Sequence, residues 1–396
     1  MLLFCAARRL IYLVLDMTSE PAPRVLVADD QTDVVIALRL LLREEGLHVD
    51  AAGSVHEVRA RLHAQDYDLL LMDLNYARDT TSGAEGLELL TELRGQDPVL
   101  PVLVMTGWGS IDTAVEAMRR GACGFVHKPW DNDALTAAIR REVEDGRALR
   151  RAQSRALREQ QEAQTIQRAL LPIEMPNAPG LEIAVRWQPA STFGGDLYDL
   201  TPLADGRVAI SIGDVCGKGL PAALLMANVQ ASVRAFASID PSPRALVDRL
   251  NRELCRHQGL RRFVTFFFAV YDPASRRLTY CNAGHNPPVA AHADGSAARL
   301  VAGGMVLGAF DHCEFDEATI DLQHGDRLVL FTDGITEASD ADDREFGDDG
   351  VLEVIRRTRG CGNAGALVDA VFEAAAQSAG GEFQDDATAL VISLAS

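Results

Sequence analysis

The stretch from Ala134 to Leu171 most constrains how this chain can fold. It is highly charged and Gly146 is its single helix-breaking residue, so we expect a long helix. Small or apolar residues, with Glu159 as the exception, recur in it at alternating spacings of three and four: Leu149, Ala152, Ala156, Glu159, Ala163, Ile166 and Leu170. This spacing is typical of a coiled-coil seam, and its alanines bury little area, which favours a weak homodimer through residues 149–170. A single amphipathic helix lying on its own domain is the alternative.

The helix divides a chain of 396 residues, which is long enough for two cores, into two acidic segments. The net charge of −19 argues against a nucleic-acid partner. The seven cysteines form no CxxC pair and their number is odd, which favours a reducing, cytoplasmic compartment. We expect a tail over residues 1–23, with Met17 as an alternative start, because its apolar run is short and no cleavage site follows. We expect no membrane association, and a membrane-touching tail is the alternative.

Each of four apolar strands in the first segment ends at polar residues. They are Arg24–Ala28 before Asp29 and Asp30, Asp68–Met72 before Asp73, Pro101–Met105 before Thr106, and Gly124–His127 before Lys128. Helical spacing separates them, as in Val34–Leu42, which predicts a doubly wound parallel sheet with its site at the carboxyl ends of the strands. Three converging carboxylates repel one another, so we expect a divalent cation between them.

This arrangement resembles the receiver domain of two-component response regulators, an α/β flavodoxin-like fold, over residues 24–143. The resemblance implies that a sensor histidine kinase or a phosphotransfer protein phosphorylates Asp73. The other residues that it assigns to the site are the Mg²⁺ ligands Asp29, Asp30 and, through its carbonyl, Asn75, and the phosphoryl-binding Thr106 and Lys128. Phe125 matches the aromatic position that moves on phosphorylation, and a core phenylalanine is the alternative. The loop between Asn75 and Leu87 is longer than the resemblance implies.

From residue 172 onward, strands and helices come in separate runs, which predicts an α+β domain of layered sheets flanked by helices over residues 172–396. The expected strands are Leu181–Trp187, Arg207–Ile212, Phe263–Tyr271, Arg277–Asn282 and Arg327–Phe331. The expected helices are Ala222–Ala237, Pro243–Cys255, 351–357 and 364–378.

Acidic residues of this second segment lie beside glycines or at strand ends in four motifs. The motifs are Gly194-Gly195-Asp196, Ile212-Gly213-Asp214, Phe331-Thr332-Asp333-Gly334 and Gln384-Asp385-Asp386-Ala387-Thr388. Glycines beside carboxylates let the backbone and a metal approach closely. Carboxylates without histidine or cysteine partners favour hard ions such as Mg²⁺ or Mn²⁺.

Together with NAGHNPP at 282–288 and TIQRALLP at 165–172, these motifs resemble the metal-dependent PPM (PP2C-type) phosphatases, in particular their stage II sporulation E and stressosome-regulated branch. The resemblance implies two Mn²⁺ or Mg²⁺ ions that activate water to hydrolyse a phosphoprotein. The residues that it assigns to catalysis and metal binding are Asp214, which bridges the ions, the carbonyl of Val215, Asp196, Asp333 and Asp385. We prefer Asp385 to Asp386 because the second position of the motif need not be acidic, and we expect Asp199 behind the ligands.

The two resemblances imply a cytoplasmic response regulator whose output is a serine/threonine phosphatase controlled by phosphorylation at Asp73. In the resembled branch the substrate is a phosphoserine anti-anti-sigma (STAS) protein. The alternative is a non-catalytic adaptor that binds its partner through a phosphatase-like fold. His285 is a candidate general acid, with a structural turn residue as the favoured alternative. Lys218 either meets the substrate phosphate or faces water.

Overall fold

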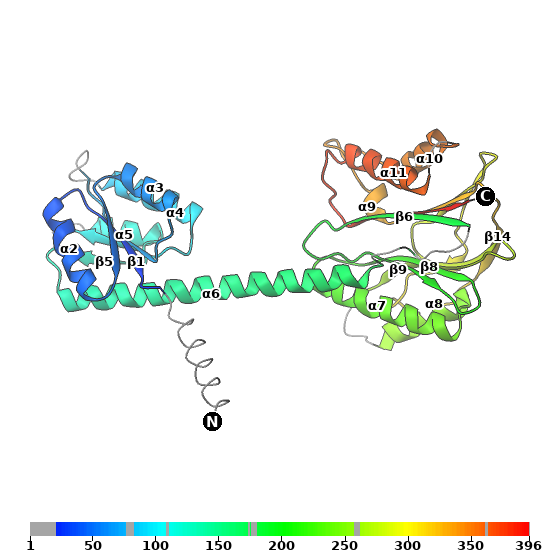
Figure 1. The fold of residues 1–396 in the computed structure, drawn as a ribbon, viewed down its shortest axis with the longest axis horizontal. Helices are drawn as coiled ribbons and strands as arrows, with labels where there is room; N and C mark the ends of the chain where they lie inside the picture. The colour runs from blue at the N-terminus through cyan, green and yellow to red at the C-terminus, as the bar shows by residue number, and fades with distance from the viewer. Residues whose placement is uncertain are drawn as a thin grey trace, which may run out of the picture. The chain divides into compact units, whose positions relative to one another are not determined.

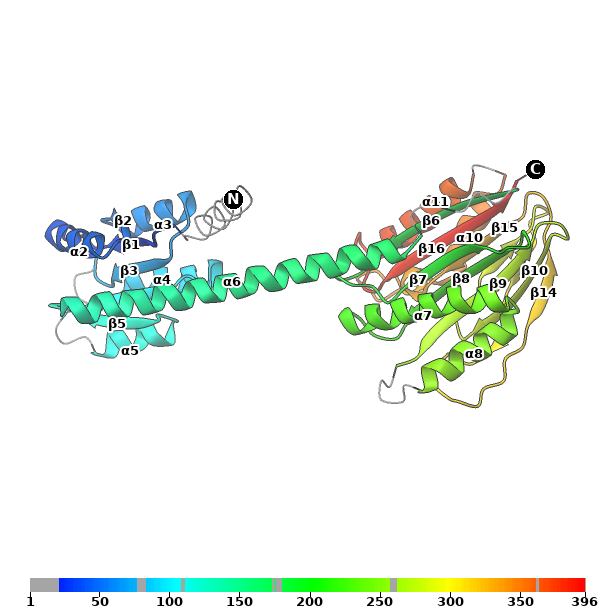
Figure 2. The ribbon, with the colours of Figure 1, turned by 60° about the horizontal axis from the view of Figure 1, so that its bottom comes forward.

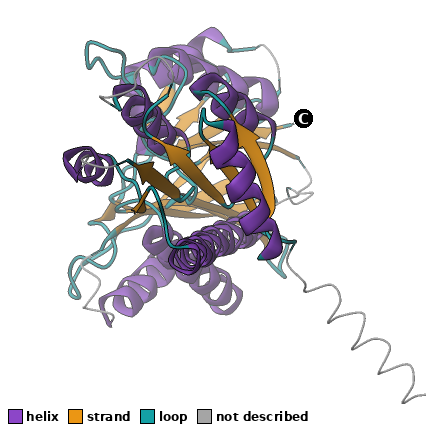
Figure 3. Cartoon of the chain, turned by 90° about the vertical axis from the view of Figure 1, so that its left-hand side faces the viewer, coloured by secondary structure: helices purple, strands orange, loops and turns teal. Residues whose placement is uncertain are grey.

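A computed structural model of the chain describes residues 21–76, 83–107, 111–172, 175, 180–256, 262–360 and 363–395. Residues 1–20, with the alternative start at Met17, and residues 77–82 of the long loop after Asn75 lie outside the described residues. The chain divides into two compact units, Met1–Glu159 and Gln160–Ser396 (Figure 1). Figure 3 distinguishes their helices, strands and loops by colour.

The N-terminal unit is built on a five-stranded parallel sheet with the strand order β2-β1-β3-β4-β5. Its strands are β1 (Arg24–Ala28), β2 (His48–Ala52), β3 (Leu69–Asp73), β4 (Val102–Thr106) and β5 (Gly124–His127). The four expected strands are present to within one residue. The sequence did not indicate β2, because this edge strand carries the polar residues His48 and Asp50 instead of a continuous apolar run.

Helices cover both faces of this sheet, as a doubly wound fold requires. On one face, α2 (Thr32–Glu44) and the first turns of α6 (Asn132–Leu170) contribute Leu38, Leu42, Leu135 and Ile139 to one core. The other face is covered by α3 (Val55–Ala64), α4 (Ala84–Gln96) and α5 (Ile111–Arg119). The predicted α/β parallel-sheet fold of this unit is confirmed.

The long helix α6 spans 39 residues and continues through Gly146 without a break. A Cβ atom at Gly146 would lie 2.6 Å from Cγ of Pro101, so the missing side chain lets the helix pack closely against the N-terminal unit. Arg147 and Arg150 extend these contacts through ion pairs with Asp68 and Asp97. The predicted boundary between receiver and linker at residues 143 and 144 stays a prediction.

Much of the predicted seam of α6 is exposed in the single chain. The side chains of Leu149 and Ile166 are 49% and 63% exposed, and every residue from 151 to 162 is exposed. Exposed apolar side chains at this spacing are compatible with a partner helix, but a second chain is needed to form a coiled coil. Pairing through residues 149–170 therefore stays a prediction.

The C-terminal unit contains two sheets. One has the order β13-β10-β9-β8-β7, with β14 paired to β10, and the other has the order β12-β11-β15-β16-β6. The strands of the first sheet are β7 (Leu197–Pro202), β8 (Val208–Val215), β9 (Val264–Asp272), β10 (Arg277–Ala283), β13 (Gly303–Gly304) and β14 (Ala318–Asp321). Those of the second are β6 (Leu181–Gln188), β11 (Val289–Ala291), β12 (Ala297–Arg299), β15 (Arg327–Phe331) and β16 (Ala387–Leu394).

The two sheets pack face to face, and helices cover their outer faces (Figures 1 and 2). Side chains such as Ile210, Phe267, Leu328 and Leu390 fill the space between the sheets. The helices are α7 (Leu220–Ile239) and α8 (Pro243–Arg256) on the first sheet, and α9 (Asp333–Thr336), α10 (Gly347–Arg357) and α11 (Ala364–Ser378) on the second. This arrangement confirms the predicted layered α+β domain.

Among the described helices, α7 alone is long and apolar enough to cross a membrane. Its apolar residues, including Met226, Val229 and Val233, pack in the core between α7 and the first sheet. The apolar composition of α7 is therefore explained by its place as a core helix.

The ion pair between Arg147 and Asp68 should stabilise the packing of α6 on the N-terminal unit. Both side chains are mostly buried, and Arg147 Nε lies 2.7 Å from Asp68 Oδ1. We expect Arg147→Met to lower the opening free energy of the β3 amides by about 1–3 kcal/mol in hydrogen exchange of the full chain. The matched control, Arg155→Met, removes an exposed pair with Glu159 on the same helix and should cost less than about 0.5 kcal/mol. Equal effects of the two variants would contradict this account.

Candidate functional site

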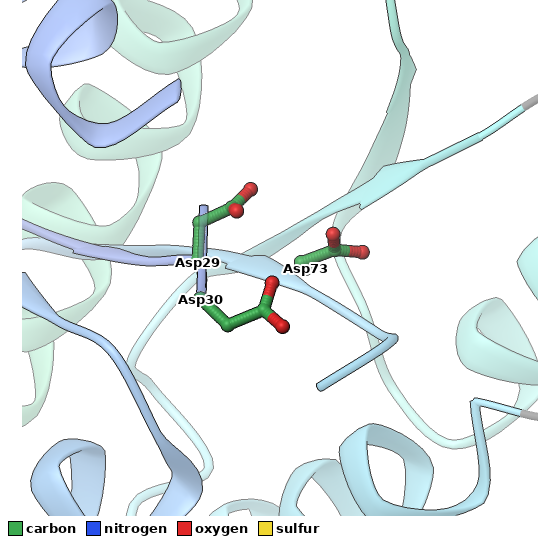
Figure 4. A group of neighbouring side chains, drawn as sticks. All are labelled: Asp29, Asp30 and Asp73. Carbon is green, nitrogen blue, oxygen red and sulfur yellow. The ribbon is translucent and has the colours of Figure 1, made fainter. Parts of the chain in front are cut away.

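Three aspartates meet at the carboxyl ends of β1 and β3 (Figure 4). Asp29 and Asp73 are buried and Asp30 is exposed, and one carboxylate oxygen from each lies within 4.8 Å of the others. Among the described residues this is the one group of three or more acidic, histidine or cysteine side chains whose ligand atoms lie so close together. Such a set of oxygen atoms suits a hard divalent cation.

Lys128 lies between the two buried aspartates of this group. Its Nζ is 2.6 Å from Oδ2 of Asp29 and 2.6 Å from Oδ2 of Asp73. Burial raises the pKa of Asp29 more than its hydrogen bond to Lys128 lowers it. Burial lowers the pKa of Lys128, but its bonds to the two carboxylates outweigh burial and leave that pKa raised. Lys128 therefore pairs with two of the three carboxyl groups, and a further cation could offset the negative charge that remains.

The remaining residues predicted for this site lie at neighbouring strand ends. Thr106 is buried at the end of β4, and its Oγ1 lies 3.2 Å from Nδ1 of His127 on β5. The N–H of Asn75 donates to Oδ1 of Asp73 at 3.2 Å. Phe125 is 47% exposed and contacts His127 edge to face, so its alternative interpretation as a core phenylalanine is wrong.

A second acidic site lies in the C-terminal unit around Asp214, near the end of β8. Burial and the charges of Asp333 and Asp385 raise the pKa of Asp214 to about 7. Burial and the charge of Asp214 raise the pKa of the fully buried Asp196. Burial and the charge of Asp385 raise that of Asp333. The fold thus brings together the four aspartates predicted from sequence, although no three of these described side chains have ligand atoms as close as those of Asp29, Asp30 and Asp73.

The two carboxylate oxygens of Asp196 differ in their hydrogen bonding. Its Oδ2 accepts hydrogen bonds from Oγ1 of Thr332 at 2.8 Å and from Oγ1 of Thr388 at 2.5 Å. Its Oδ1 is buried without a hydrogen-bond partner. A buried carboxylate oxygen is costly to leave unpaired, and a bound cation would remove this cost. The donor set, made of carboxylates and backbone carbonyls, therefore fits Mg²⁺ or Mn²⁺.

The neighbouring aspartates Asp385 and Asp386 differ in their contacts. Asp386 accepts backbone N–H bonds from Ala190 at 2.8 Å and from Gly195 at 2.5 Å, so both of its oxygens are used within the fold. Asp385 accepts the N–H of Asp386 on its Oδ1 at 2.8 Å, and its Oδ2 lies 3.2 Å from Nζ of Lys218. Asp386 thus binds two backbone N–H groups and Asp385 pairs with a side-chain cation, and the choice of Asp385 as the metal ligand stays a prediction.

Gly195 is required where the backbone passes the acidic site. A Cβ atom on it would lie 2.8 Å from the carbonyl oxygen of Val215 and 3.2 Å from Oδ1 of Asp214. Any larger residue would push against two groups that the sequence assigns to metal binding. The close approach thus places the backbone between Gly194 and Asp196 directly against these groups.

Other residues singled out in the sequence have structural contacts. Asp199 pairs with Arg234 and accepts the N–H of Leu200 at 2.9 Å. Burial lowers the pKa of His285 to about 3, and its Nδ1 lies 3.0 Å from Oγ1 of Thr265. A neutral, buried imidazole fits the structural interpretation of His285 and not the general acid.

Sequence reasoning did not single out Thr332, Thr388 or Gln167. The two threonines occur inside the recognised acidic motifs, so their position beside aspartates was the available signal. Gln167 occurs in TIQRALLP, but nothing in the helical spacing showed that it would be buried at 4% exposure. Its contacts depend on tertiary packing.

The raised pKa of Asp214 predicts a pH dependence of stability in the metal-free chain. Its folded pKa of about 7 lies above the unfolded value of about 3.9, so the folded state holds the proton more tightly. The stabilisation from this proton is complete below pH ~4 and is lost as the pH rises through about 7. In calorimetric unfolding with a chelator, we expect Asp214→Asn to be more stable than the wild type at pH 8 and to lose less stability between pH 5 and pH 8. The exposed control Asp205→Asn should follow the wild type, and a wild-type slope in Asp214→Asn would refute the assignment.

Comparisons with known proteins agree with the two units. Residues 25–140 match the response regulator receiver domain family, and residues 204–395 match stage II sporulation protein E. The second match includes Asp214, Asp333 and Asp385, whereas Asp196 precedes it.

Two curated relatives cover different parts of the chain. Phosphoserine phosphatase RsbU of Bacillus subtilis is 28% identical over 253 residues, which are 63% of this chain and 74% of RsbU. The alginate biosynthesis transcriptional regulatory protein AlgB of Pseudomonas aeruginosa is 34% identical over 130 residues, which are 33% of this chain. The chain spans 28% of the length of AlgB, so this likeness concerns one domain.

Among solved structures, the SiaA-PP2C domain of Pseudomonas aeruginosa aligns with a TM-score of 0.54 and 21% identity. The alignment covers 61% of this chain and 97% of that domain, and it supports the PP2C-type fold. The chain therefore joins a response regulator receiver domain to a domain of the stage II sporulation E (PP2C) family.

Proposed function

We propose that this chain is a response regulator whose C-terminal unit is a metal-dependent protein serine/threonine phosphatase. The observation that carries the proposal is the buried, unpaired Oδ1 of Asp196 in a group with Asp214, Asp333 and Asp385. A binding surface has no need to gather such mutually repelling carboxylates, whereas a metal-dependent hydrolase does. The similarity to phosphoserine phosphatase RsbU supports the reaction class.

In this proposal Asp214 would contribute to holding two divalent cations. The carbonyl of Val215 and Asp196 would hold one ion, and Asp333 and Asp385 would hold the other. Bound Mn²⁺ or Mg²⁺ would supply activated water and compensate negative charge on the phosphoryl oxygens. Thr332 and Thr388 fix Asp196 in place, and no side chain of the protein has to act as a nucleophile.

Control is assigned to the N-terminal unit. Phosphorylation of Asp73 adds negative charge beside Lys128, which already pairs with this carboxylate. Mg²⁺ held by Asp29, Asp30, Asp73 and the carbonyl of Asn75 would assist phosphoryl transfer, and Thr106 and Lys128 would bind the phosphoryl oxygens. The added charge would favour a conformational change of the N-terminal unit.

The partners in this proposal follow from the same two units. A sensor histidine kinase or a phosphotransfer protein supplies the phosphoryl group to Asp73, and the substrate is a phosphoserine protein of the STAS anti-anti-sigma type. The exposed side chains of Leu149 and Ile166 support pairing of two chains along residues 149–170. We place the protein in the cytoplasm, without contacts to nucleic acid or membrane.

Loss of the shared carboxylate should abolish catalysis. We expect Asp214→Asn to lower kcat for Mn²⁺-dependent phosphate release from a phospho-STAS protein by at least about 10³-fold. The reason is that the variant replaces the negatively charged ligand proposed for both ions by a neutral amide. Phosphate release measured beside circular dichroism separates this loss from unfolding. The control Asp205→Asn changes an exposed aspartate of the same unit and should keep wild-type activity. Undiminished phosphate release by Asp214→Asn would contradict the two-metal proposal. A wild-type protein that is inactive on every phosphoprotein would favour a non-catalytic adaptor.

Control of the phosphatase by phosphorylation of Asp73 can be tested separately. A small-molecule phosphodonor should change the phosphatase rate of the wild type but not that of Asp73→Asn, because the variant cannot accept the phosphoryl group. The exposed control Asp66→Asn should respond as the wild type does. Equal rates of the wild type with and without the phosphodonor, under conditions where Asp73 is shown to be phosphorylated, would remove the regulatory part of the proposal.

A further inference from the structure

Gln167 is a buried polar residue on an otherwise exposed part of α6. Every residue from 151 to 162 is exposed, whereas the side chain of Gln167 is only 4% exposed. Burial of a side-chain amide is unfavourable unless both its N–H and its oxygen find partners. The contacts of this amide therefore show what holds the end of α6 in the C-terminal unit.

The nitrogen and the oxygen of the Gln167 side-chain amide both form hydrogen bonds with the backbone of Gly194. Nε2 of Gln167 donates to the carbonyl oxygen of Gly194 at 2.6 Å, and its Oε1 accepts the N–H of Gly194 at 3.3 Å. Seven residues earlier, on the same side of the helix, Gln160 Nε2 donates to Oγ1 of Thr192 at 2.9 Å. Two turns of α6 therefore lie along the segment from Thr192 to Gly194.

This segment leads directly into the acidic site. Gly195 donates its N–H to Oδ2 of Asp386 at 2.5 Å and passes close to the carbonyl oxygen of Val215 and to Asp214. The next residue is Asp196, whose Oδ1 lacks a partner. The backbone from Gly194 to Asp196 is thus held by Gln167 on one side and by Asp386 on the other.

The end of α6 is also fixed to α7. The carbonyl oxygen of Leu170 accepts hydrogen bonds from Nε2 of Gln230 at 2.9 Å and from Arg234 at 3.1 Å, and Leu171 packs in the core with α7. These contacts anchor the helix whether or not Gln167 keeps its amide. Replacement of Gln167 should therefore loosen the Gly194–Asp196 backbone on the side that faces α6, without detaching the helix.

We infer that Gln167 is a positioning residue that sets the place of the Gly194–Asp196 backbone and thereby the metal affinity of the acidic site. The inference rests on the proposed phosphatase function and adds to it a residue through which α6 acts on that site. Because α6 begins at Asn132 in the receiver unit, a shift or rotation of this one helix would be transmitted to Gly194 through the amide of Gln167. The inference assigns Gln167 no contact with substrate.

The test compares Gln167→Met, which keeps the length of the side chain but can neither donate nor accept these bonds, with the wild type. We expect the Mn²⁺ concentration for half-maximal phosphate release to rise roughly tenfold, as the loss of two buried hydrogen bonds allows, while kcat at saturating Mn²⁺ stays within about twofold. Gln167→Glu keeps an acceptor for the N–H of Gly194 but places its second carboxylate oxygen against the carbonyl oxygen of Gly194, so it should not restore the wild-type Mn²⁺ requirement. The control Gln160→Met loses an exposed bond to Thr192 and should keep the wild-type Mn²⁺ requirement.

A second readout does not depend on activity. In metal-free hydrogen exchange of the full chain, Gln167→Met should speed exchange at residues 192–196 and leave the amides of α7 and β8 protected. An unchanged Mn²⁺ requirement, or faster exchange spread over the whole C-terminal unit, would overturn the inference. A wild-type chain that releases no phosphate at any Mn²⁺ concentration would overturn the proposed function instead, and the exchange pattern would still decide whether Gln167 holds this backbone.

Discussion

Electrostatic repulsion between carboxylates at strand ends is the constraint on which both units depend. In the N-terminal unit Lys128 offsets part of the repulsion between Asp29 and Asp73. In the C-terminal unit the nearest ammonium group, that of Lys218, contacts Asp385, and the buried Asp196 faces Asp214 without such help. Carboxylates kept in this arrangement cost stability in the absence of a cation, so their presence is better explained by metal binding than by folding.

The fold meets this constraint by surrounding the carboxylates with short, rigid contacts. Thr332 and Thr388 hold one oxygen of Asp196, and Asp386 binds the N–H groups of Ala190 and Gly195. Asp386 therefore fixes the backbone beside the site through both of its oxygens. The same backbone is reached from α6 by Gln167, so the acidic site and the long helix share one short segment.

Much of both sites could be predicted from sequence because their aspartates lie next to apolar strands, either after them, as Asp29 and Asp333 do, or before them, as Asp196 does. Asp73 ends β3 of the parallel sheet, where sites gather at the carboxyl ends of strands, and Asp214 lies near the end of β8 next to Gly213. The edge strand β2 could not be predicted in this way, because its sequence lacks an apolar run. Gly146 and Gln167 show a further limit of prediction from sequence. Gly146 permits close packing against Pro101, and Gln167 is buried against the backbone of Gly194. Neither contact can be predicted from the local periodicity of α6.

The central claim is that the C-terminal carboxylates exist to hold two cations through Asp214. Anomalous diffraction at the manganese edge, from crystals of the full chain grown with Mn²⁺, tests it most directly. The account predicts two peaks in the C-terminal unit, both within bonding distance of Asp214, with the unpaired Oδ1 of Asp196 turned toward one of them. Peaks confined to the Asp29, Asp30 and Asp73 group, at Mn²⁺ concentrations that support phosphate release, would contradict it.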